Sequence, residues 1–181
     1  MALRATVYKC TLDVSDLDRS YYGSHELTLA RHPSETEERL MLRLLAFALY
    51  ADDGLAFGRG LSTDDEPDVW LRDATGNVVH WIELGLPDER WLRRAAGRAR
   101  QVTLIAYGER ALGPWLERFG PVLQRLDTLE IKLIADADLA RLGACCGRNM
   151  QVSCTVQDGR IWFSAGADTL ELELKAVHAG R

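Results

Sequence analysis

The feature that most constrains the fold is the order of element types in the middle of the chain. Residues 69–72 and 77–84 are rich in β-formers and flank residues 73–76, whose Asp-Ala-Thr-Gly sequence is typical of a hairpin turn. A helix signal follows over 87–100, and 102–107 is a continuous apolar strand. A strand, a helix and a strand in this order predict a crossover connection between parallel strands.

The rest of the chain fits an α/β (α+β) protein with a central mixed β-sheet flanked by helices. Residues 6–14 and 21–31 predict an opening hairpin, and the runs 150–156, 160–164 and 170–177 predict an added antiparallel meander at the C-terminal end. No repeat or linker interrupts the pattern, so we expect one domain over residues 1–181.

Two helices carry boundary signals. Ser34 followed by Glu37 forms a capping box, which predicts a helix that runs to about Tyr50. A third helical segment, 111–123, contains two Gly-Pro pairs and is expected to be interrupted by them.

Composition narrows the functional classes. The 181 residues carry a net charge of −5, which argues mildly against a constitutive, non-specific nucleic-acid binder. The N-terminal residues contain no apolar signal core, and the longest apolar stretch, 44–51, is too short to span a bilayer. We therefore expect a cytoplasmic protein without a membrane partner.

The hairpin offers a candidate metal site. If Asp73 pairs with Val78 across a four-residue loop, the register places Asp68 opposite Glu83, with Cβ atoms roughly 4.5–5.5 Å apart. Two such carboxylates repel one another unless a cation or a proton lies between them, and Mg²⁺ prefers such oxygen ligands. The alternative is that one carboxylate is solvated and the other pairs with an arginine. A register shift of one residue would move one of them to the opposite face.

A third acid is expected from the first helix. Glu38 lies at the end of the apolar face, so it is the candidate to approach the same cavity. The alternative is a first-turn glutamate that interacts with the helix dipole.

The second predicted helix carries arginines at 90, 94 and 98, opposite its apolar side. Such a stripe can hold phosphates through bidentate contacts, and Arg90 and Arg94 are the candidates. The alternative is a solvated face partly neutralised by the acids at 88 and 89.

Several stretches resemble the YaeQ family of bacterial proteins. The central ones are Glu66-Pro67-Asp68 and residues 81–89, and the others are 32–39, 43–48, 60–62 and 157–162. The resemblance implies a variant of the PD-(D/E)XK nuclease architecture. In that superfamily, a proline-aspartate and an acid-x-lysine on adjacent strands bind Mg²⁺ for phosphodiester hydrolysis. Pro67-Asp68 matches the first element and Glu83 the acid of the second, while Glu38 or Glu35 could match an assisting glutamate.

The sequence departs from that motif at the lysine position, which is Gly85. Either the chain is inactive or a basic residue elsewhere replaces the lysine, with Lys9, Arg90 and Arg94 as candidates. Arginine stays protonated, so it can stabilise phosphoryl charge but is a poor general base.

Three functions remain open at this stage. The first is a Mg²⁺-dependent phosphodiesterase of nucleic acid that uses Asp68, Glu83 and Glu38. The second is a non-catalytic module on a nuclease-like fold that binds or regulates nucleic acid or a protein partner. The third is a hydrolase of nucleotides or other small molecules that uses the same acids.

Overall fold

The computed structural model describes residues 4–61 and 65–178 as a mixed α+β chain, with four helices and eleven strands among these residues. The helices are α1 (Glu37–Leu49), α2 (Glu89–Arg98), α3 (Glu109–Leu123) and α4 (Asp136–Ala144). The strands are β1 (Thr6–Asp16), β2 (Tyr21–Arg31), β3 (Leu55–Phe57), β4 (Val69–Arg72), β5 (Val78–Leu84), β6 (Ala99–Ala106), β7 (Leu129–Ile134), β8 (Asn149–Gln157), β9 (Arg160–Ala165), β10 (Asp168–Leu172) and β11 (Leu174–His178). None of the four helices is both long and apolar enough to cross a membrane.

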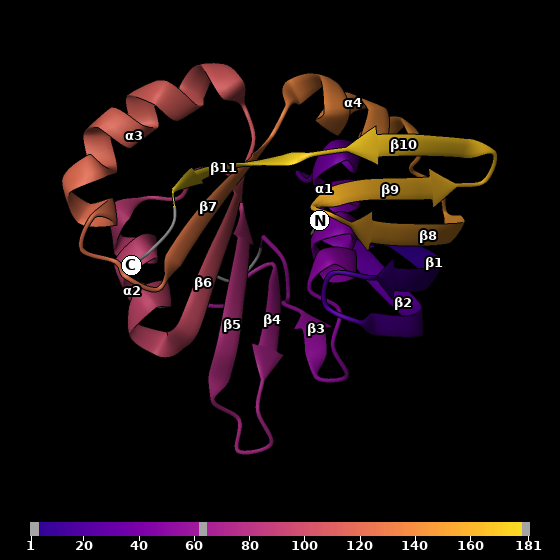
Figure 1. The fold of residues 1–181 in the computed structure, drawn as a ribbon, viewed down its shortest axis with the longest axis horizontal. Coiled ribbons are helices and arrows are strands. Elements are labelled where there is room, and N and C mark those ends of the chain that lie inside the picture. Colours follow the sequence, from indigo (N-terminus) through magenta and orange to yellow (C-terminus); the bar gives the residue numbers. More distant parts are fainter. Residues whose placement is uncertain (1–3, 62–64, 179–181) are drawn as a thin grey trace.

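The strands form two mixed sheets, which lie side by side in Figure 1. Sheet A has the order β10-β9-β8-β1-β2, and sheet B has the order β11-β7-β6-β5-β4-β3. In sheet B, β5, β6 and β7 are parallel, and helices α2 and α3 connect them. The predicted crossover is therefore confirmed.

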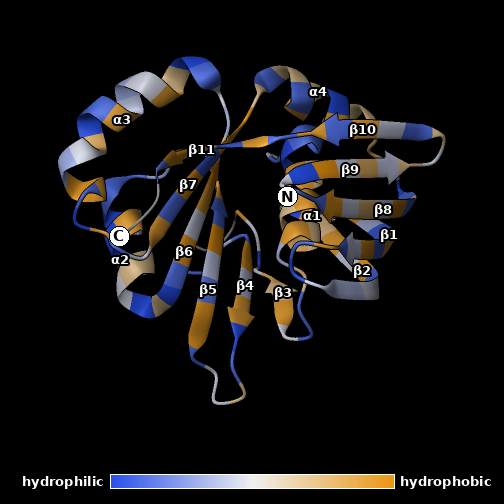
Figure 2. Cartoon of the chain, viewed as in Figure 1, coloured by the Kyte–Doolittle hydropathy of each residue, from blue (hydrophilic) through white to orange (hydrophobic). Residues whose placement is uncertain are grey.

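Sheet B buries both of its faces because its side chains alternate between two cores. Trp81, Leu104 and Ile131 belong to a core that also contains Leu92 of α2 and Phe119 of α3. Residues of the opposite parity, including Ile82 and Ile105, belong to a second core with α1 and sheet A. Hydrophilic and hydrophobic residues alternate along α3, as expected for a helix with one face on a sheet (Figure 2).

Helix α1 lies between the two sheets and contacts β1 and β8 of sheet A as well as β3, β4 and β5 of sheet B. Its residues from Arg39 to Ala48 are all buried. A helix surrounded on all sides must be apolar nearly all round, and this buried part of α1 fulfils this except at Arg39 and Arg43. These two arginines are part of the candidate site described below.

The C-terminal strands correct one topological prediction. Strands β8, β9 and β10 form the predicted antiparallel meander, but β8 also pairs in parallel with β1, so the meander and the opening hairpin form a second sheet, sheet A. The predicted strand over 170–177 is also two strands. The chain leaves sheet A after Leu172 and pairs with β7 of sheet B from Leu174, and Figure 1 shows this crossing in yellow. Strand pairing over such sequence separations is a tertiary choice that local patterns do not encode.

Two helix predictions also need correction. The N-cap of α1 is Thr36, whose hydroxyl accepts from the backbone N–H of Arg39, whereas Ser34 bonds to the ring of His32. The two prolines of α3 lie inside one continuous helix. The buried residues of α3 lie three and four positions apart, and we infer that their packing on sheet B offsets the hydrogen bonds that the prolines remove.

Candidate functional site

The hairpin of β4 and β5 places Asp68 opposite Glu83, as predicted. Val69 pairs with Ile82. The same register places Asp68, just before Val69, opposite Glu83, just after Ile82. The route to this register differs from the prediction. Asp73 donates its N–H to the carbonyl of Asn77, so the loop is one residue shorter, and a bulge in β5 restores the register. The two deviations cancel because each changes the pairing by one residue.

Asp68 is 4% exposed and has defined partners. Its Oδ2 accepts from Nη2 of Arg39 at 2.8 Å and from the backbone N–H of Leu84 at 3.0 Å. The second bond connects the carboxylate of Asp68, just before β4, to the end of β5. Asp68 thus has the arginine partner that the alternative interpretation of the pair predicted, although the arginine comes from α1.

Glu83 is half-buried as a residue, but its Oε2 is shielded from solvent and has no hydrogen-bond partner among the described residues. Burial raises the pKa of the Glu83 carboxyl well above its usual value, and the neighbouring Asp68 carboxylate raises it further. Arg39 opposes this shift in pKa. The Glu83 carboxyl therefore takes up a proton more readily than an ordinary glutamate does.

A chain of buried ion pairs connects this pair to α1. Arg39 donates to Glu35 Oε1 at 3.0 Å, and Arg43 donates to Glu35 Oε2 at 2.9 Å and to the carbonyl of Ala30. Burial by itself lowers the pKa of Arg39, but Asp68 and Glu35 raise it above the ordinary value. Arg39 therefore remains a cation beside Asp68.

Our sequence analysis did not identify Arg39 and Arg43 as site residues. The signal was present, because Arg39 and Arg43 lie four residues apart within an otherwise apolar run, and Glu35 precedes Arg39 by the same interval. Charged residues on such a face are almost never fully buried unless they are paired.

The structure does not bring Glu38 or Lys9 to the cluster. Glu38 is exposed, and its side chain lies against Gly143 of α4, on another side of α1. The glutamate that joins the cluster is Glu35, which precedes the N-cap Thr36 and pairs with Arg39 and Arg43. Lys9 is exposed on β1 between the buried Tyr8 and Cys10, so its side chain points to the outer face of sheet A, away from α1.

Arg90 and Arg94 lie on α2 and line a hollow of about 240 Å³ together with Pro87, Asp88 and Trp91. Arg90 is exposed, and Arg94 forms an ion pair with Asp65 at 3.2 Å. These arginines therefore border the segment that leads into Asp68, but the cation in direct contact with Asp68 is Arg39.

Gly85 marks a change of backbone at the lysine position of the motif. Strand β5 ends at Leu84, and Gly85 has φ = +99°, which an L-residue rarely adopts. A Cβ at this position would meet the ring of Tyr107 at 3.5 Å, an ordinary contact, so backbone conformation and not space explains the glycine.

The donor types at the pair are those that Mg²⁺ prefers. Glu83 Oε2 is a buried oxygen without a partner next to a second carboxylate, and Mg²⁺ commonly takes one or two carboxylates and keeps several waters. Within residues 4–61 and 65–178, no group of three or more His, Cys, Asp or Glu side chains could enclose an ion. Asp68 Oδ2 already accepts two hydrogen bonds.

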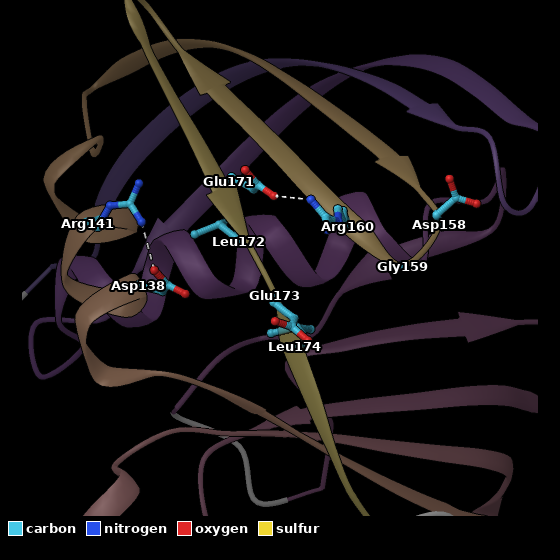
Figure 3. Close-up of a pocket in the computed structure, with 9 residues that line it drawn as sticks. All are labelled: Asp138, Arg141, Asp158, Gly159, Arg160, Glu171, Leu172, Glu173 and Leu174. Atoms are coloured by element: carbon cyan, nitrogen blue, oxygen red, sulfur yellow. Dashed lines mark hydrogen bonds and ion pairs between the residues drawn. The ribbon is translucent and has the colours of Figure 1, made fainter.

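A larger hollow of about 710 Å³ lies elsewhere, between α4 and the ends of β9 and β10. Its two arginines each pair with an acid of the same hollow, Arg141 with Asp138 and Arg160 with Glu171 (Figure 3). Because these pairs neutralise both arginines, this hollow is a weaker candidate for binding an anion.

Comparisons with known proteins agree in sequence and structure. The family described as YaeQ protein matches residues 1–174. The chain is 47% identical over 176 residues to the proteins of Salmonella typhi and Escherichia coli (strain K12) that are both described as "Uncharacterized protein YaeQ", covering 97% of each chain. The crystal structure of YaeQ protein from Xanthomonas axonopodis pv. citri is similar with a TM-score of 0.92, 46% identity and coverage of 97% of this chain and 99% of that one. The YaeQ protein from Pseudomonas syringae gives a TM-score of 0.91 and 36% identity, with 97% of both chains covered. The chain belongs to the YaeQ family.

Proposed function

We propose that this protein is a divalent-cation-dependent phosphodiesterase of nucleic acid, built on a variant of the PD-(D/E)XK fold, with Asp68 and Glu83 as ligands of Mg²⁺. The observation that carries the proposal is the buried acid pair, in which Glu83 Oε2 has no partner among the described residues. Two neighbouring carboxyl groups repel one another when both are charged, and a cation bound between them would remove that repulsion.

The chain's own residues fix the geometry of this site. The Leu84 N–H and Arg39 hold the Asp68 carboxylate in one orientation, and Glu35 holds Arg39 in turn. A bound divalent cation supplies a water of lowered pKa and stabilises charge on the phosphate. Hydrolysis joins the water oxygen to phosphorus and breaks the bond to the leaving oxygen, which takes up a proton.

Arg39 is our candidate for the charge that the motif lysine supplies in related folds. It reaches Asp68 from α1, so its positive charge lies next to the acid pair although position 85 is glycine. Arg39 stays protonated and cannot act as a base, so it is a positioning residue that also contributes a fixed charge.

Calorimetric titration with MgCl₂ and MnCl₂ tests the proposal. The wild type should bind either ion, and Asp68→Asn and Glu83→Gln should lose that binding while circular dichroism shows an intact fold. Asp138→Asn, which changes a carboxylate of the other hollow, is the matched control and should bind normally. Labelled single-stranded and double-stranded DNA and RNA then test cleavage. Ion binding or cleavage that survives both site variants would contradict the proposal.

One observation favours a second candidate, a non-catalytic nucleic-acid-binding module. Arg39 and Leu84 already take both hydrogen bonds at Asp68 Oδ2, so the guanidinium satisfies part of the charge that an ion would neutralise. This candidate predicts oligonucleotide binding in EDTA, no heat of Mg²⁺ binding and no hydrolysis. The two candidates are therefore separated by the same titration.

A further inference from the structure

The hollow at the start of α2 combines an aromatic ring with two arginines. Trp91, Arg90 and Arg94 line it together with Pro87 and Asp88, and its volume is about 240 Å³. This is below the usual range of about 300–1,000 Å³ for sites that enclose a drug-sized ligand. The hollow therefore suits one flat ring and an adjoining charged group.

The ring of Trp91 is anchored from below. It meets Trp81 of β5 at a centroid distance of 5.8 Å and an interplanar angle of 71°, and Trp81 meets Trp70 of β4 at 6.4 Å and 86°. An edge-to-face contact occupies at most one of the two faces of the Trp91 ring. Trp91 is half-buried, so the indole is held in place while part of it remains accessible. A rigid aromatic surface of this kind is a stacking platform for a nucleobase.

The charges beside Trp91 favour a phosphate. Arg90 is exposed and forms no ion pair with the described residues, and Arg94 is partly buried beside the same hollow. Asp88 also lines the hollow, but its carboxylate accepts from the backbone N–H of Trp91 at 2.8 Å, which offsets part of its charge. Four of the ten residues of α2 are arginine, and Arg100 follows the C-cap Ala99, so the helix is locally basic in an acidic protein.

The hollow is connected to both members of the acid pair, to Glu83 through the chain and to Asp68 through an ion pair with a residue just before it. Pro87 follows Glu83 by four residues, so their Cα atoms lie within about 14 Å, and Arg94 holds Asp65, three residues before Asp68. At the ~3.4 Å rise of one DNA strand, a segment of roughly four nucleotides covers this distance. A strand seated on α2 would thus place a phosphodiester near Asp68 and Glu83.

We infer that the hollow of Arg90, Trp91 and Arg94 binds an unpaired nucleotide, so the preferred partner of the site is single-stranded nucleic acid and not a continuous duplex. This inference rests on the proposed function for the nearby site. The base stacks on Trp91 and its phosphate contacts Arg90 and Arg94. In a duplex, both faces of an internal base are stacked on neighbouring base pairs, so Trp91 can reach a base only where the strand is unpaired.

Fluorescence anisotropy in EDTA tests the inference without any contribution from a metal. The probes are a fluorescein-labelled dT₁₂ strand and a blunt duplex of the same length. The wild type should bind the single strand at least tenfold more tightly than the duplex. Trp91→Ala should weaken single-strand binding about tenfold, and Trp91→Phe should retain most of it, because stacking of a base on an aromatic ring is what the variant removes.

Arg90→Ala supplies a second variant that does not touch the core. It should lower the slope of log K against log salt concentration by about 0.7, the value for one phosphate contact on a single strand. Trp162→Ala and Arg160→Ala, on β9 of the other sheet, are the matched controls and should bind like the wild type. Equal affinity for strand and duplex, or wild-type binding by Trp91→Ala, would overturn the inference. Binding without hydrolysis would leave it standing and count against the phosphodiesterase.

Discussion

Arg39 joins two buried carboxylates, and its guanidinium is the centre of the polar chain inside the protein. Its side chain is 10% exposed, and its partners Glu35 and Asp68 are 2% and 3% exposed. Removing one partner of a buried ion pair leaves an uncompensated charge, which costs more than the pair itself contributes.

We therefore expect Arg39→Met to lower the free energy of unfolding by about 3–5 kcal/mol, measured by urea denaturation. Arg160→Met is the matched control, because Arg160 pairs with Glu171 on the surface, with exposures of 66% and 58%. Its loss should change stability by less than about 1 kcal/mol. Equal effects of the two substitutions would mean that the buried network is not important for stability.

Gly85 allows a second test at the scale of one residue. Gly85→Lys restores the residue type of the nuclease motif, but φ = +99° strains any side chain there. We expect a loss of about 1–3 kcal/mol in thermal unfolding experiments and no gain in cleavage. Gly97→Ala in α2, where a Cβ meets nothing within 4 Å, should instead stabilise the protein by roughly 0.5–1 kcal/mol. Increased activity of Gly85→Lys would show that the lysine position is functional in this chain.

At the scale of elements, β5 contacts the end of α1 through His80. The His80 ring is buried, bonds to Thr103 of β6 at 2.8 Å and lies edge-on to Tyr50. Burial lowers its pKa to about 4, with Lys132 and Arg19 as further causes.

This shift in pKa predicts a dependence of stability on pH. The unfolded chain binds a proton at His80 near pH 6.5, whereas the folded protein does so near pH 4. The contribution of neutral His80 to the free energy of unfolding is therefore complete above pH 6.5 and is lost as the pH falls toward 4. The loss amounts to about 3 kcal/mol for this group. Urea unfolding of wild type and His80→Gln at pH 4, 5, 6 and 7 measures it as the difference between the two curves. Parallel curves would show that His80 does not contribute.

At the scale of the whole molecule, α1 connects the two sheets. It is buried between them and contributes to the core that they share, so this shared core is lost from both sheets if α1 leaves. We therefore expect the described chain to unfold in one cooperative transition.

Guanidinium unfolding followed by two probes checks this expectation. Four of the five tryptophans lie in sheet B or its helices, and Trp162 lies in sheet A. Tryptophan fluorescence of the Trp162→Phe variant therefore reports the unfolding of sheet B, whereas far-UV circular dichroism reports the whole chain. The two midpoints should coincide. Leu42→Ala, at a fully buried position of α1, should lower both midpoints by the same amount. The corresponding loss in the free energy of unfolding is about 2–5 kcal/mol. Separate midpoints would indicate two independently stable units.

The sequence alone determined the local elements and the place of the acid pair. The hairpin of β4 and β5, the N-cap of α2 at Asp88 and the crossover into β6 follow from turn residues and periodicity, which act between near neighbours in the chain. The hairpin also predicts that Asp68 lies opposite Glu83, although the structure reaches this register through a shorter loop and a bulge in β5.

Only the tertiary structure decided which groups meet the acid pair and how the strands divide. Arg39 reaches Asp68 across 29 residues of sequence, and β1 pairs with β8 rather than leaving the C-terminal strands as a separate layer. Such contacts depend on how buried faces fit together in space. A side chain at a given spacing in the sequence can meet many partners, and the packing of α1 between the sheets selects one.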